Sequence, residues 1–472
     1  MKKIILPICL FAIFGNSAYS KDVESNHSYR NLGFTQAPTV SIGGSIDVLG
    51  ALPKQDGTRT TGDGTSADPF KDEDTYSQEK LGGTLNNRAT DDISIAGDAT
   101  LLFTLNGIND YGFKYGALME LNANSTYASW NDNLNSNRAY IYGELLLGKF
   151  EIGAEQGASQ KMKVDAATFA RGAGGINGKY LNFINLPSVV TSTGALSASS
   201  PLFILIPELP TAHGGYAMGF NNLSYTCDIN GDGTVDITTA GQEKECFEKY
   251  GNDNYRLRFQ EMQTAMKVSY YTPEIYGFQA GVSYTPDTGN RGTSGFLTSK
   301  LNTGDIDDVL EYGLSYSDTF EGLSVALSYT GQVGKSESKK LDSVTGKYKS
   351  FRKDLNASQY GANISFFGLT FGGSMGNWND SLFYTTEATK GKGTYSTLGM
   401  AYEFGPVNAS VGYMQSEFQD NQYKAYSIDF DYKVAKGFLP YVEFTSFDFK
   451  PKDSSIVKNK GYVILSGFLL NF

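Results

Sequence analysis

Histidine, tryptophan and cysteine are scarce in this chain of 472 residues, which has two, two and three of them. A hydrolase of the lipase or protease type needs a histidine base beside a nucleophile or a carboxylate. The only candidates are His27, near the start, and His213, in a long polar segment, and neither lies in a segment with strand character. No enzymatic activity is therefore expected.

Long apolar runs are absent after the first residues, so hydropathy gives no membrane-spanning helix there. The start has two lysines, an apolar run from Ile4 to Phe14 and small residues up to Ser20, which predicts a signal peptide over residues 1–20 and a mature chain over 21–472. The apolar run is shorter than the roughly 20 residues that a spanning helix needs. Strands that show lipid an apolar residue only at every second position escape such a hydropathy search.

Glycine, tyrosine and phenylalanine are abundant, with 54, 31 and 30 residues. Apolar residues alternate with small polar ones in 322–330, and with charged ones in 422–434. This period of two predicts β-strands, but it is also compatible with a soluble β-sandwich. About sixteen strands are expected, near residues 40–50, 93–106, 111–123, 137–147, 150–157, 262–273, 277–285, 308–318, 322–332, 355–366, 368–376, 393–404, 406–416, 422–434, 438–449 and 460–472.

The connections between these segments alternate between short turns and long polar stretches. Gly107–Asp110 and Gly405-Pro406 are tight turns, whereas the stretch 158–261 is very long. Outer-membrane barrels have short periplasmic turns and long extracellular loops in this order, and their closure leaves no unpaired edge in lipid. The last segment also ends on an aromatic residue, Phe472. The sequence therefore predicts an all-β fold, a transmembrane antiparallel β-barrel in the bacterial outer membrane.

Two hairpins resemble those of a known family. Asn137–Gln156 resembles the strand, turn and strand that lead to the third loop of the Gram-negative trimeric general porins, and Tyr271–Tyr284 looks like another hairpin of that family. The resemblance implies sixteen strands, a homotrimer and a third loop (residues 158–261) folded into the lumen, with 164–175 at the constriction. This loop is several times longer than usual, so part of it is expected to lie outside the barrel.

The same resemblance implies a porin, a water-filled channel for passive diffusion of small hydrophilic solutes and ions. Its expected surroundings are outer-membrane lipids and lipopolysaccharide, and no nucleic-acid partner is expected. Two alternatives remain open, namely a surface adhesin or receptor barrel that binds through its long loops, and a channel specific for sugars or phosphate. Stacked aromatics along the constriction would favour sugars, and clustered lysine and arginine would favour phosphate.

Charged residues on the faces expected to point inward are mostly acidic, which predicts a mild preference for cations. Arg138 and Arg171 are candidates for a positive wall opposite Asp165, or else are ordinary charges in water. The inward acids are Asp47, Asp98, Glu120, Glu151, Glu155, Glu311, Glu403, Asp429 and Asp431, against Lys114, Lys267 and Lys433. The candidate constriction residues are Asp165, Arg171, Arg138, Glu120, Glu155, Lys114, Asp429 and Asp431.

One stretch of the long loop matches the front of a calcium-binding loop, with Gly233 at the position where such loops turn sharply. Thr239 replaces the usual bidentate glutamate, so affinity should be low, and an ordinary polar turn is the alternative. Cys227 and Cys246 bracket this stretch and predict a disulfide worth about 3 kcal/mol, with two free thiols as the alternative. No cofactor is required, and the candidate calcium ligands are Asp228, Asn230, Asp232, Thr234 and Asp236.

Overall fold

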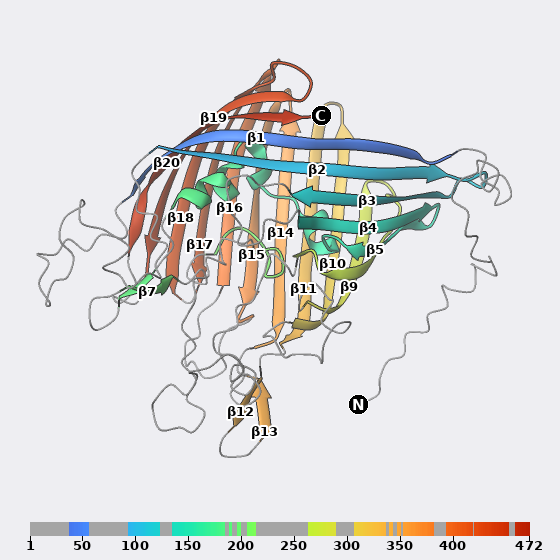
Figure 1. The fold of residues 1–472 in the computed structure, drawn as a ribbon, viewed down its shortest axis with the longest axis horizontal. Helices are drawn as coiled ribbons and strands as arrows, with labels where there is room; N and C mark the ends of the chain where they lie inside the picture. The colour runs from blue at the N-terminus through green and yellow to red at the C-terminus, as the bar shows by residue number, and fades with distance from the viewer. Residues whose placement is uncertain are drawn as a thin grey trace, which may run out of the picture.

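The protein is built on a closed antiparallel barrel of sixteen strands (Figure 1). The computed structural model describes residues 37–55, 93–122, 135–184, 188–190, 196–199, 205–213, 263–288, 306–336, 339–342, 347–350, 353–381, 393–418, 420–452 and 458–472. Within these ranges, no helix has the length and apolar character needed to cross a membrane. The barrel strands are β1 (Thr39–Gln55), β2 (Ser94–Ile108), β3 (Lys114–Asn122), β4 (Asn135–Leu145), β5 (Gly148–Ala154), β8 (Met266–Tyr271), β9 (Phe278–Asp287), β10 (Ile306–Phe320), β11 (Leu323–Ser336), β14 (Leu355–Phe366), β15 (Leu369–Asn379), β16 (Gly393–Phe404), β17 (Val407–Phe418), β18 (Asn421–Tyr432), β19 (Phe438–Lys450) and β20 (Asn459–Asn471). Two separate hairpins pair β6 (Ser188–Val190) with β7 (Leu196–Ser199) and β12 (Lys339–Asp342) with β13 (Lys347–Ser350).

The barrel closes where its first strand meets its last. β1 pairs with β2 on one side and with β20 on the other. Beyond the last strand, Phe472 and Gly44 exchange both backbone hydrogen bonds, at 3.0 and 3.1 Å. A closed sheet has no open edge whose N–H and C=O groups would lie unpaired in lipid. The predicted all-β class and the count of sixteen strands are confirmed.

Side chains alternate strictly between the two faces of the wall. On β18, Tyr426, Ile428 and Phe430 are exposed on the outer face, whereas Asp429 and Asp431 are buried inside. Strand ends differ from the prediction mainly at β1, which was expected to end at residue 50 but continues to Gln55. The extension arises because β1 keeps pairing with β20 after its pairing with β2 has ended.

The short turns adopt the conformations that their glycines permit. Glu321 and Gly322 have φ of 50° and 90°, and Phe367 and Gly368 have φ of 48° and 79°. Two consecutive residues with positive φ form the mirror-image turn that matches the twist of a β-hairpin. These two-residue turns join β10 to β11 and β14 to β15 at the same end of the barrel (Figure 1).

The first part of the third loop lies inside the barrel. This inner segment (residues 155–184) contains the short helices α1 (Ala158–Lys161), η5 (Ala167–Phe169), η6 (Gly175–Asn177) and η7 (Lys179–Phe183). Helix α1 contacts β8 to β11, η5 contacts β16 and β17, η6 contacts β17 to β19, and η7 contacts β20 and β1. The segment therefore follows the inner wall from β8 round to β1, which is twelve of the sixteen barrel strands. Figure 1 shows its helices within the curve of the sheet.

Glycines on the inner face make the space that this segment occupies. A Cβ atom on Gly361 would lie 1.7 Å from the carbonyl oxygen of Val164, and one on Gly412 would lie 2.9 Å from Ile176. Gly399 likewise faces Ala166 at 2.9 Å. Real Cβ atoms do not approach other atoms so closely, so any larger residue would push the segment away from the wall.

Replacement of Gly361 with alanine tests this close packing of the inner segment against the wall. Because the added methyl group meets backbone rather than a movable side chain, we expect the Gly361→Ala barrel to lose about 1–3 kcal/mol of stability. The measurement is the thermal unfolding midpoint in detergent, followed by circular dichroism. Gly50→Ala is the matched control, because its added Cβ would meet only the Ser466 carbonyl oxygen, at 3.9 Å. Equal midpoints for the two variants would show that the inner segment does not pack closely against Gly361.

Candidate functional site: the third loop inside the barrel

The entry of the inner segment carries a chain of ion pairs on the wall of β3 to β5. Arg138 on β4 donates from Nε to Glu120 on β3 at 2.6 Å, and its Nη1 lies 3.5 Å from Oε1 of Glu155, just after β5. Asn137 donates to the other oxygen of Glu120 at 2.6 Å. Three of the predicted constriction residues, Glu120, Arg138 and Glu155, are thus in direct contact.

Lys161 of α1 extends this chain of charges. Its Nζ pairs with Glu151 and lies 3.7 Å from Oε2 of Glu155, and it also stands 5.0 Å from the centre of the Tyr140 ring. Lys149 pairs with the other oxygen of Glu151 at 2.8 Å. The carboxylates are almost fully buried in the wall, whereas Lys161 keeps 22% of its side chain exposed. The positive member of each pair therefore faces the lumen.

The middle of the inner segment is held by a buried group of three charges. Lys163 Nζ lies 2.9 Å from Asp165 and 2.7 Å from Glu208, and all three side chains are at most 8% exposed. Burial alone would lower the pKa of Lys163, but the two carboxylates raise it above its usual value. Burial raises the pKa of the Glu208 carboxyl, and Lys163 opposes that rise. An unpaired charge at this depth would be costly, so the three groups depend on one another.

Glu208 belongs to a second part of the third loop that returns to the lumen, the return segment (residues 205–213). Trp378 of β15 donates from Nε1 to the Glu208 carbonyl oxygen at 2.8 Å, and the Thr211 N–H donates to Gln332 of β11 at 3.2 Å. Leu205 and Leu209 pack with Trp378 in one buried apolar cluster. The third loop is therefore fastened to the wall at two places that are distant in sequence.

The far wall of the barrel holds the tip of the inner segment through acids. Arg171 pairs with Glu403 of β16 at 2.8 Å and with Asp431 of β18 at 3.2 Å. Glu443 of β19 accepts a hydrogen bond from the Gly175 N–H at 2.9 Å, and Asp429 of β18 is its cross-strand neighbour. Further along, Lys179 pairs with Asp47 of β1, which also accepts a hydrogen bond from Tyr441 at 3.0 Å.

The predicted positive wall is not formed. Arg138 and Arg171 contact different walls, and each is paired with two carboxylates. Asp165 faces neither of them, because it is buried beside Lys163. Lys114 pairs with Glu144 at 2.7 Å next to the β2–β3 turn.

Sequence reasoning missed several residues that hold the loop. Their common feature is a position in the loop itself or on an inner face that was not singled out. The apolar run 202–206, bounded by Pro201 and Pro207, was a signal that could have located the return segment. The missed residues are Lys149, Lys161, Lys163, Lys179, Glu208 and Glu443.

Some predictions fall outside the described residues. These are the signal peptide over 1–20, the disulfide between Cys227 and Cys246, and the calcium stretch 228–236. Among the residues that the structure describes, no group of three or more His, Cys, Asp or Glu side chains could hold a metal ion. The disulfide and the calcium site therefore stay predictions.

Removal of the buried lysine tests how the two loop parts are joined. Lys163→Met leaves Asp165 and Glu208 buried without a cation, so we expect a loss of about 3 kcal/mol of stability. The thermal unfolding midpoint reports the change. Lys335→Met is the matched control, because the Lys335–Asp308 pair is exposed and such pairs contribute about 0–1 kcal/mol. A midpoint for Lys163→Met as high as that of the control would show that the buried pairs do not hold the loop.

Comparisons with known proteins agree with this architecture. The family model described as Gram-negative porin matches residues 17–452. An uncharacterized protein of Rickettsia bellii is 26% identical over 71% of this chain and 76% of its own length. An uncharacterized protein of Rickettsia conorii is 26% identical over 72% of this chain and 76% of its own length.

Solved structures are similar at lower identity. An anion-selective porin from Comamonas acidovorans is 13% identical, with a TM-score of 0.49 over 92% of this chain and 100% of that one. A mutant Rh. blastica porin is 12% identical, with a TM-score of 0.47 over the same shares. The family model covers most of the sequence and the structure is a closed barrel of sixteen strands. This chain belongs to the Gram-negative porins and is a multi-pass β-barrel of the outer membrane.

Proposed function

We propose that the barrel is a general diffusion channel for small hydrophilic solutes and ions, and that the inner segment forms its constriction. The observation that carries this proposal is the path of residues 155–184 inside the closed wall. The helices of the segment pack along β8 to β11, β16 to β20 and β1, and the wall of β2 to β4, which Glu155 and Lys161 reach at Arg138 and Tyr140, forms the other side of the passage. Asp98 on β2 and Glu403 on β16 are exposed charges on inner faces, as a hydrated passage requires.

We also propose that the passage prefers cations mildly. Acids exceed bases on the inner faces, and some of these acids accept hydrogen bonds from neutral donors. Glu311 accepts its hydrogen bond from Ser159, and Glu443 accepts hydrogen bonds from Thr445 and the Gly175 N–H. Rings of carboxylates favour cations in a pore. The proposed constriction residues are Glu120, Arg138, Glu155, Arg171, Asp429 and Asp431, with Asp165 holding the loop in place and Lys114 lining the passage near the β2–β3 turn.

The short strands of one wall support a homotrimer. β5 has seven residues and β8 has six, whereas a strand that crosses a bilayer needs about 9–11. The outer face here is apolar: Ile141 of β4, Ile152 of β5 and Val268 of β8 are cross-strand neighbours, and all three are exposed in the single chain. We propose that neighbouring subunits cover this short wall, because lipid cannot match its height.

The ion preference is measured as the reversal potential across a planar bilayer under a potassium chloride gradient. We expect a small preference for potassium, and a smaller one in the Asp98→Asn, Glu403→Gln double variant, because two exposed carboxylates are removed from the passage. Asp308→Asn is the control, since Asp308 lies by the outer Tyr284 hydroxyl at 2.7 Å. A preference for chloride in the wild type would reject the proposed cation selectivity.

The oligomeric state is measured by native mass spectrometry of the detergent-purified chain. We expect a trimer for the wild type and a shift to monomer for Ile152→Lys, because a lysine in the middle of the short wall would be buried without a partner between subunits. Val411→Lys places the same charge on the long wall and should leave the trimer intact where it folds. A wild-type monomer would contradict the proposed assembly.

A further inference from the structure

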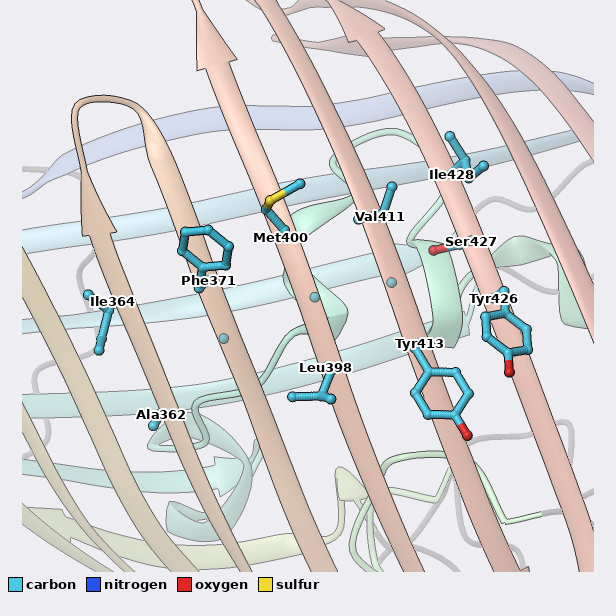
Figure 2. A pocket seen from close by; sticks show the side chains of 13 residues that line it. Ala362, Ile364, Phe371, Leu398, Met400, Val411, Tyr413, Tyr426, Ser427 and Ile428 are labelled. Carbon is cyan, nitrogen blue, oxygen red and sulfur yellow. The ribbon is translucent and has the colours of Figure 1, made fainter.

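A shallow apolar groove crosses the outer face of the barrel on β14 to β18, and its volume is about 760 Å³. Two rows of outward side chains border it. Figure 2 shows Phe371 and Met400 in one row, and Leu398 and Tyr413 in the other. Because neighbouring strands lie about 4.8 Å apart, a groove across five strands is about 19 Å long. Such a narrow, elongated shape suits a single extended hydrocarbon chain.

The floor of the groove is the backbone of a row of small residues. Gly372, Gly399 and Gly412 are cross-strand neighbours that line it, and their Cβ positions point into the barrel. There the missing side chains make room for Phe169 and Ile176 of the inner segment. The same stretch of wall therefore contacts the inner segment on its inner face and forms the groove on its outer face.

The groove reaches the loop-side limit of the apolar band on β17 and β18, whereas on β14 and β15 it lies close to the short turn at Phe367 and Gly368. Its border nearer the loops includes Tyr413 and Tyr426, which are cross-strand neighbours. The next outward pair in that direction is polar, Gln415 and Lys424, and the Tyr413 hydroxyl donates to Gln415 at 2.9 Å. Aromatic girdles mark the membrane interface in such barrels. Since the long loops of an outer-membrane porin are extracellular, the β17–β18 end of the groove lies in the outer leaflet, and from there the groove runs deeper into the bilayer toward β14.

The strands under the groove are long enough to cross the bilayer without a neighbour. β14 to β18 have 11 or 12 residues each, against the roughly 9–11 that a membrane requires. The short wall of β5 and β8, by contrast, is the face that we assign to subunit contacts. The groove is therefore continuous with the lipid-facing surface and not with the proposed interface.

We propose that this groove holds one acyl chain of an outer-leaflet lipid whose anionic headgroup lies at Lys424. The apolar rows bury the chain, and the tyrosine hydroxyls and the ammonium group stand where a headgroup begins. The inference rests on the membrane location of the barrel and does not depend on its conductance or ion selectivity.

The test uses the full-length protein, delipidated in detergent and titrated with dioleoyl phosphatidylglycerol or dioleoyl phosphatidylcholine. Native mass spectrometry counts the lipids retained per chain. We expect one lipid per chain at low excess, with the anionic lipid retained more strongly. Ala362→Leu with Val411→Phe fills the groove and removes the burial of about two methylene groups, so retention should fall about tenfold.

Two controls separate the groove from the rest of the lipid-facing surface. Ala409→Leu adds the same side chain on an outward position that does not line the groove, and should retain the lipid. Lys424→Gln should lose the preference for the anionic lipid while still binding both. Strand content by circular dichroism confirms that each variant folds. Equal lipid retention by the filled variant and the wild type would overturn the proposal. If the filled variant also lost its oligomeric state, a second copy of the chain and not a lipid would cover the groove.

Discussion

The requirement that every backbone polar group in the bilayer be paired underlies the rest of this structure. Only a closed sheet meets it, and closure here depends on the pairing of β1 with β20 and of Gly44 with Phe472. Once the wall is closed, its outer face contacts lipid and its inner face contacts water, so apolar side chains point out and polar ones point in. The alternation of the sequence and the polar inner face both follow from this closure.

A wide barrel of sixteen strands has an interior that its own side chains do not fill. In this chain the inner segment occupies part of that space, and the wall is adapted to it by glycines such as Gly361 and Gly399. The segment is then fixed by charges that are buried in pairs, as with Lys163 and Glu208. Apolar packing alone would leave the loop free to slide along a smooth wall, whereas directional ion pairs and hydrogen bonds define one position for it.

The sequence predicted the barrel well because the period of two is a local property that each strand carries independently. It placed Glu120, Arg138 and Glu155 together among the candidate constriction residues because they lie on or next to inward faces of adjacent strands, and the structure shows that they form ion pairs. It did not predict Lys163 with Glu208, since their contact depends on the path of a long loop that has no period. For the same reason the sequence left open whether Arg138 and Arg171 form a positive wall, and the structure shows each arginine paired with acids on its own side of the barrel.

We propose that the loop held inside the closed barrel leaves a water-filled passage. Single-channel conductance of the purified protein in a planar bilayer tests it most directly. The account predicts stepwise openings with a linear current–voltage relation, grouped in threes if each subunit conducts. A barrel that is folded and inserted in the bilayer but never conducts would contradict the account, and would favour a surface receptor whose long loops bind a partner.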